Sequence, residues 1–192
     1  MMKIGQARTF TRQCSHILSW TVFLFVAFIL QGCASKPLQP PPADYASKAI
    51  RLHFDSSYSL NLYDGQAHAL VMCVYQLTDP EVFEDKLQEP MGPNRLLACD
   101  QFDPSVTARK RVIVQPGTKT SVVLNRSQGT RYLGLIAGYY QRQGNDFYMV
   151  TPIPVVIKRV GLFKKKAFLG ILEMDIQLGP SGIGKTDVIE EK

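Results

Sequence analysis

Alternation of apolar and polar residues with a period of two is the feature that most restricts the fold of this chain. It is clearest from Ile50 to Asp55 and from Leu172 to Leu178. Such alternation is typical of strands with one buried face. Further strand-like segments lie at 69–77, 108–114, 120–124, 131–141 and 147–156. About seven short strands separated by turn signals predict an all-β fold, an antiparallel β-sandwich over residues 49–179.

One short helix interrupts the predicted strands. Thr78-Asp79-Pro80-Glu81 offers a capping residue, an early proline and an acid in the first turn. We expect the helix to run to about Gln88, because Pro90 follows. Residues 89–105 are expected to be irregular, and residues 180–192 to form a flexible tail.

The N-terminal segment has the features of a bacterial lipoprotein signal. Three basic residues precede an apolar run of about 14 residues, too short for a transmembrane helix, which needs roughly 20. The run leads into Leu30-Gln31-Gly32-Cys33, which resembles the lipobox. Residues 1–32 are therefore predicted to be a signal peptide, with diacylglycerol and an N-acyl chain attached to Cys33. A signal anchor with an incidental cysteine is the alternative.

The residues after Cys33 indicate where the anchor goes. Position +2 is Ala34, not the aspartate that retains lipoproteins in the inner membrane, so we expect the outer membrane, periplasmic side. Residues 33–48 are rich in proline and are predicted to form a lipidated, extended tether.

The charge excludes a nucleic-acid-binding function. Removing residues 1–32 takes away three basic residues and no acid, so the formal net charge falls from +6 to +3. A nucleic-acid partner would select for a denser basic surface.

Two cysteines, Cys73 and Cys99, are left once Cys14 is cleaved off and Cys33 is lipidated. In the oxidising periplasm they are candidates for a disulfide, although two buried free thiols are an alternative. Without a nearby histidine pair they do not predict a metal site.

The residues predict no enzyme activity. The segment from Gly179 to Thr186 fits the P-loop pattern GxxxxGK[ST], but only six residues follow it. A nucleotide site would need a helix and further parallel strands there, so we expect no nucleotide. His53 and His68 are interpreted as solvated side chains rather than general bases.

Two surface segments are candidates for contacts. The first combines apolar, aromatic and amide side chains in a predicted loop: Leu60, Asn61, Leu62, Tyr63, Asp64, Gly65 and Gln66. It is either a recognition loop or, at Leu60 and Leu62, an extension of the core. The second is a predicted hairpin that either solubilises the chain or contacts anionic lipid or an acidic partner; its basic residues are Lys158, Arg159, Lys164, Lys165 and Lys166.

The order of these segments resembles a known family. After the lipobox and the tether come Leu60-Asn61, Asp64-Gly65-Gln66, the strand from Val71 to Leu77, and the strand from Arg131 to Tyr140. This order is similar to that of the outer-membrane lipoprotein of the bacterial type VI secretion system. The resemblance implies a transthyretin-like sandwich with one added helix, no enzyme activity and no cofactor apart from the lipid.

The resemblance also implies a partner and a contact site. The partner would be the periplasmic C-terminal region of a large inner-membrane secretion protein, and the loop containing Leu60–Gln66 would be the main contact. The alternative is a lipoprotein that binds a glycan or a cell-wall fragment, for which Tyr139, Tyr140, Phe147 and Tyr148 would need to form a concave aromatic cluster.

Overall fold

The computed structural model describes residues 40–142, 144–161 and 164–189. The predicted signal peptide, Cys33 and the first part of the predicted tether, up to residue 39, lie outside these residues. No helix in the described ranges is both long and apolar enough to cross a membrane.

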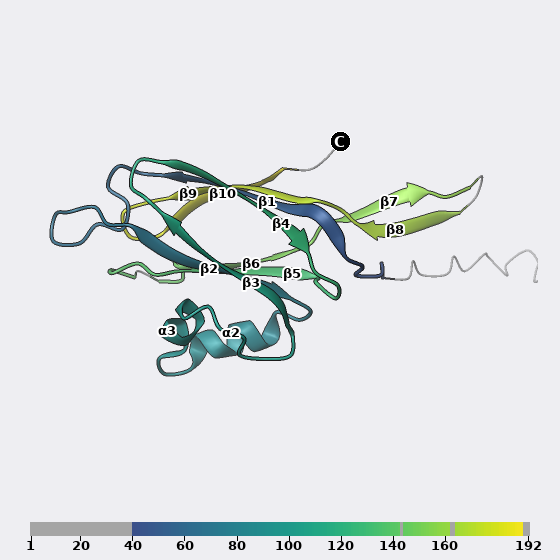
Figure 1. Ribbon diagram of the computed structural model, residues 1–192, viewed down its shortest axis with the longest axis horizontal. Coiled ribbons are helices and arrows are strands. Elements are labelled where there is room, and N and C mark those ends of the chain that lie inside the picture. Colours follow the sequence, from purple (N-terminus) through teal and green to yellow (C-terminus); the bar gives the residue numbers. More distant parts are fainter. Residues whose placement is uncertain (1–39, 143, 162–163, 190–192) are drawn as a thin grey trace, which may run out of the picture. The chain divides into compact units, whose positions relative to one another are not determined.

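Two four-stranded sheets face each other, and a separate two-stranded ribbon extends from them (Figure 1). The first sheet has the order β10 (Ile183–Ile189), β9 (Leu172–Leu178), β1 (Ala46–Ser56) and β4 (Lys119–Arg126). The second has the order β3 (Val106–Val114), β2 (Leu70–Leu77), β5 (Tyr132–Ala137) and β6 (Tyr148–Pro152). The ribbon consists of β7 (Val155–Arg159) and β8 (Lys165–Leu169). The predicted all-β sandwich is confirmed.

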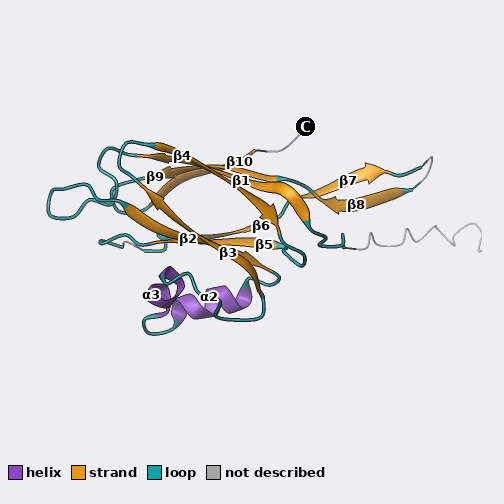
Figure 2. Cartoon of the chain, in the orientation of Figure 1, coloured by secondary structure: helices purple, strands orange, loops and turns teal. Residues whose placement is uncertain are grey.

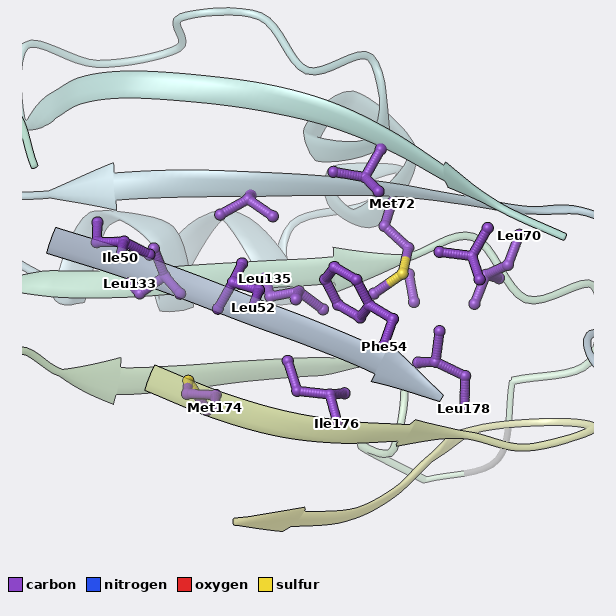
Figure 3. Packing of buried hydrophobic residues seen from close by; sticks show 14 of the residues in the cluster. Ile50, Leu52, Phe54, Leu70, Met72, Leu133, Leu135, Met174, Ile176 and Leu178 are labelled. Carbon is purple, nitrogen blue, oxygen red and sulfur yellow. The ribbon is translucent and has the colours of Figure 1, made fainter. Parts of the chain in front are cut away.

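The main core lies between the two sheets, where the alternating residues of β1 and β9 meet the inner face of β2 and β5 (Figure 3). Leu52 and Phe54 are almost completely buried, and Leu52 lies opposite Met174 on β9. Burying each large aliphatic or aromatic side chain contributes about 1.5–3 kcal/mol. The period of two in the sequence therefore reports the face that each strand buries.

One strand pairing differs from the antiparallel prediction. β1 runs parallel to β9, whereas the other pairs within the two sheets are antiparallel. Parallel neighbours need a long connection, and here most of the domain separates Ser56 from Leu172. Alternation reveals which face is buried but not the direction of the neighbouring strand.

Two helices, not one, cover the outer face of the second sheet (Figure 2). Helix α2 (Glu81–Gln88) was predicted, but α3 (Gly92–Leu97) lies in the segment that was expected to be irregular. The prediction missed α3 because six residues are too few to show a helical period. Its Gly92-Pro93 start nevertheless suits a helix N-terminus, where proline loses no hydrogen bond.

The two helices, together called the helical layer, explain why the residues of β2 are almost all apolar. Its inner side chains face the main core, while Tyr75 and Leu77 pack against Phe83 and other residues of the helical layer. The Tyr75 hydroxyl donates a hydrogen bond of 2.7 Å to the Leu96 carbonyl, and burial raises the pKa of Tyr75 to about 12. The structure also joins Cys73 to Cys99 by a disulfide, with 5.5 Å between the Cα atoms.

The predicted flexible tail is wrong for most of its length. Residues Ile183–Ile189 form β10, which pairs antiparallel with β9 at the edge of the first sheet. The residues of β10 are half-buried or exposed. Backbone hydrogen bonds to β9 hold this strand in the sheet. Because no side chain of the strand is fully buried, its sequence shows no clear alternation of apolar and polar residues.

Candidate functional site

The loop between β1 and β2, residues 57–69, is held firmly at its base. The buried Ser56 hydroxyl has its one proton between the carbonyls of Gln115 and Thr118, at 2.7 and 2.9 Å, and accepts from the Thr118 amide. The Ser57 amide donates to the Leu178 carbonyl at 2.9 Å. The loop therefore leaves the sandwich between the β3–β4 turn and the end of β9.

The first two residues of the predicted contact set point inward. Leu60 is 0% exposed and belongs to the main core, and Asn61 is 2% exposed. The Asn61 side chain donates to the Ala69 carbonyl at 3.2 Å and accepts from the Tyr140 amide at 2.9 Å. Leu62 is half-buried. Leu60 and Asn61 thus fix the loop from below and are not part of an exposed contact surface.

The remaining residues, from Tyr63 to Gln66, form an exposed and ordered tip. The amides of Tyr63 and Gln66 each donate to the other's carbonyl, at 2.9 and 3.0 Å. Asp64 and Gly65 between them have φ values of 50° and 74°, the pattern of a type I′ turn, for which Asp-Gly is a favoured pair. The tip is therefore a tight two-residue turn.

Three aromatic rings, from Tyr63, His68 and Tyr140, gather beside this tip and are called here the aromatic cluster. The ring centroid of Tyr140 lies 5.0 Å from that of Tyr63 and 5.1 Å from that of His68. Tyr63 is 50% exposed and Tyr140 60%. His68 Nδ1 lies 2.9 Å from the Gln66 carbonyl oxygen, which can only accept a hydrogen bond, so Nδ1 carries a proton.

Two members of this surface lie outside the predicted contact set: His68, which was interpreted as a solvated side chain, and Tyr140. Tyr140 is the more distant of the two along the chain. It lies more than 70 residues from Tyr63 in the chain and was considered only for a glycan site. Its position depends on the bond from its amide to Asn61, and no local sequence signal indicates that contact.

The inward position of Asn61 leads to a stability prediction. Asn61→Ala is expected to lower the free energy of unfolding by about 1–3 kcal/mol, because the Tyr140 amide and the Ala69 carbonyl lose their partner. The exposed Gln66→Ala is expected to stay within about 0.5 kcal/mol of the wild type. Urea denaturation of the two variants measures the difference. Equal midpoints would show that Asn61 does not hold the loop.

The loop and the N-terminal start of the domain lie at opposite ends of β1 (Figure 1). β1 has 11 residues, and a strand rises roughly 3.3 Å per residue, so its two ends lie roughly 30 Å apart. The first residue of β1 therefore lies at one end of the domain, and the loop with the aromatic cluster lies at the other.

The predicted basic hairpin is the ribbon β7–β8. Lys158 pairs with Lys166 across the ribbon, and Arg159 pairs with Lys165. All four side chains and that of Lys164 are exposed. The ribbon lies at the end of the domain where β1 starts, far from the aromatic cluster (Figure 1).

The four aromatic residues considered for a glycan site do not converge. Tyr139 is buried in the main core, and its hydroxyl donates to the Gly182 carbonyl at 2.8 Å. Phe147 packs edge-on against Tyr148, whereas Tyr140 belongs to the aromatic cluster. The arrangement that would favour this alternative is not formed.

The segment that matches the P-loop pattern adopts a different structure. The Gly179 amide donates to the backbone carbonyl of Gly182 at 2.9 Å. The Ile183 amide donates to the backbone carbonyl of Asp146 at 2.6 Å. From Ile183 onward the chain is strand β10, not a helix. The helix N-terminus that would hold phosphate oxygens is therefore replaced by a strand.

Ser121, His53 and Glu173 form a row across β4, β1 and β9 that has the residue types of a hydrolase triad. His53 Nδ1 lies 2.9 Å from the Ser121 hydroxyl, and Nε2 lies 3.2 Å from a Glu173 carboxylate oxygen. The hydrogen bond from His53, assisted by one from Arg51, lowers the pKa of Glu173. These side chains lie on the outer face of the first sheet, on three neighbouring strands. We interpret the row as a cross-strand polar contact.

A family model matches most of the sandwich. The model described as "Type VI secretion lipoprotein, VasD, EvfM, TssJ, VC_A0113" matches residues 48–173. These residues include most of β1, the loop and most of the sandwich. No curated protein matches the chain significantly.

Solved structures share the fold at low sequence identity. The type VI secretion lipoprotein TssJ1 from Pseudomonas aeruginosa is 19% identical, with a TM-score of 0.55 over 79% of this chain and 100% of that one. Lip from Serratia marcescens, a membrane-bound component of that system, is 18% identical, with a TM-score of 0.53 over 74% and 98%. A chain from the structure of the TssM C-terminal domain (869–1107) from EAEC is 15% identical, with a TM-score of 0.52 over 74% and 98%.

Proposed function

Because this chain belongs to the family of type VI secretion lipoproteins, we propose that it anchors the membrane complex of that secretion system to the outer membrane. In this proposal it binds the periplasmic C-terminal region of a large inner-membrane component. The family is one of secretion lipoproteins, and the proposed role is tethering without catalysis, metal, nucleotide or nucleic acid.

The anchor in this proposal is the lipid on Cys33. Diacylglycerol on the thiol and a further acyl chain on the amino group would hold the chain in the inner leaflet of the outer membrane. The proline-rich segment after Cys33 would give the domain reach into the periplasm. Confining the domain to the membrane raises its effective concentration near a membrane-bound partner, so a modest loop affinity is enough.

A structure named for the TssM C-terminal domain contains a chain of this fold, and we propose a protein of the TssM type as the partner. The opposed positions of tether and loop are consistent with this role. A domain held at the outer membrane through its N-terminal end would present its far end toward the inner membrane, where such a partner is anchored.

The assignment of the contact surface depends on the aromatic cluster. Tyrosines are frequent among the residues that dominate binding energy, and the tip of the loop holds Tyr63 in place without covering it. We propose that Tyr63, Tyr140, His68 and the turn at Asp64-Gly65 form the centre of the interface, while Leu60 and Asn61 support it from the core.

Removing the two exposed tyrosines tests this assignment. The double variant Tyr63→Ala/Tyr140→Ala is expected to bind the partner's periplasmic region about 100-fold more weakly, because two central aromatic anchors are lost. Stability is expected to change by no more than about 1.5 kcal/mol, the value of an aromatic pair. Binding is measured by calorimetry with purified domains, and stability by thermal unfolding.

Tyr45→Ala is the matched control. Tyr45 is also 60% exposed, but it lies just before β1 at the opposite end of the domain. Its loss is expected to leave partner affinity unchanged. Wild-type affinity of the double variant, or an equal loss in Tyr45→Ala, would refute the assignment.

A further inference from the structure

The ribbon β7–β8 concentrates positive charge in a way that the fold does not require. Lys158 faces Lys166 and Arg159 faces Lys165 in directly opposed positions. Like charges placed opposite each other across strands are destabilising, and a two-stranded ribbon is only marginally stable. The sequence thus places an arrangement that costs stability in a ribbon that is itself only marginally stable.

The acidic residues of the domain do not compensate for this charge. The chain contains no acid between Asp146 and Glu173. Within residues 40–142, 144–161 and 164–189, the ion pairs all involve other basic side chains. Lys166 instead lies over the ring of Phe168, with Nζ 5.3 Å from the centroid. The positive charge is therefore available to an external anion.

Exposed apolar side chains accompany the charge. Val155, Ile157 and Val160 are 53%, 58% and 53% exposed. Lysines on an isolated ribbon can serve simply to prevent edge-to-edge aggregation. That explanation fits the lysines but not three exposed β-branched residues beside them, which work against solubility. Apolar side chains combined with basic ones are typical of segments that lie at a membrane interface.

The position of the ribbon relates it to the anchored end of the chain. The buried Arg126 donates one hydrogen bond of 2.7 Å to the Gly170 carbonyl at the base of the ribbon. It also donates to the Asp44 carbonyl, just before β1, at 3.4 Å. A shallow groove between them is lined by Ala46 and Ser47 on one side and by Val156 and Phe168 on the other. The ribbon thus extends from the point where the tether reaches the sandwich.

We propose that the ribbon is a second membrane contact, with its basic residues on anionic phospholipid headgroups and its exposed valines and isoleucine at the interface. This inference relies on the proposed function only for the position of the lipid anchor. Two contacts, lipid and ribbon, would orient the domain so that the aromatic cluster points away from the bilayer.

Binding to vesicles tests this contact without the acyl chains. The mature chain, residues 33–192 with Cys33→Ser, is expected to co-sediment with vesicles of equal parts phosphatidylcholine and phosphatidylglycerol, but not with phosphatidylcholine alone. Replacing Lys164, Lys165 and Lys166 by glutamine is expected to weaken this binding about 100-fold. High salt is expected to abolish it, since the screening length falls to about 3 Å at 1 M.

A second triple variant controls for net charge. Lys110→Gln/Lys119→Gln/Lys185→Gln removes the same charge from exposed positions outside the ribbon and is expected to bind the vesicles as the parent protein does. Thermal unfolding of both triple variants verifies that they are folded.

Several results would overturn the proposal. The first is that the mature chain does not bind anionic vesicles, and the second is that it binds neutral vesicles equally well. The third is that both triple variants lose the same amount of vesicle binding. A ribbon variant that binds vesicles normally but no longer captures the partner would assign the ribbon to an acidic protein surface instead. The vesicle assay contains no secretion partner, so its failure leaves the aromatic cluster untouched. Conversely, Tyr63→Ala/Tyr140→Ala is expected to bind vesicles normally.

Discussion

Replacing Cys33 with serine is expected to release the protein from the membrane and to abolish type VI secretion. Each buried CH₂ of an acyl chain contributes about 0.8 kcal/mol to membrane affinity, so the loss of several chains removes nearly all of the binding energy. The ribbon alone would provide only a weak, salt-sensitive contact. Membrane fractionation after a high-salt wash, together with a secretion assay, measures both effects.

Cys14→Ser is the matched control, because it changes a cysteine that is removed with the predicted signal peptide. It is expected to leave both localisation and secretion intact. A Cys33→Ser protein that still sediments with salt-washed membranes would contradict the lipid anchor and favour an uncleaved membrane anchor.

Loss of the Cys73–Cys99 disulfide is expected to lower the free energy of unfolding by about 3–4 kcal/mol. The two cysteines are 26 residues apart, and in the chain-entropy model closing a loop of this length restricts the unfolded chain by about that amount. Guanidinium denaturation of Cys73→Ala/Cys99→Ala against the oxidised wild type measures the effect. Adding reductant is expected to lower the wild type to nearly the same stability and to leave the double variant unchanged.

Other contacts are expected to keep the helical layer in place without the disulfide. Arg109 and Arg111 on β3 donate to the carbonyls of Cys99 and Ala98, just beyond the end of α3. Tyr75 still bonds Leu96. The variant should therefore fold and bind its partner at room temperature. Wild-type stability in the double variant, or in reduced wild type, would show that the disulfide does not restrain the unfolded chain.

The sequence alone determined the features that depend on local spacing. The alternation in β1 and β9 identified their buried faces, because a strand turns successive side chains to opposite sides. The signal at Asp79-Pro80-Glu81 identified helix α2. The Asp-Gly pair between Tyr63 and Gln66 is likewise a pair that favours the tight turn found at the tip of the loop.

The tertiary structure alone decided the features that depend on distant partners. The parallel pairing of β1 with β9 joins segments more than 100 residues apart, and the same alternation would fit an antiparallel neighbour equally well. β10 is held by backbone hydrogen bonds to β9, which every residue except proline can form, so its sequence resembles a tail. Tyr140 reaches Tyr63 only because Asn61 turns inward and binds its amide. A side chain's spacing along the chain indicates which face it occupies, but the surface that it forms depends on which strand ends the fold brings together.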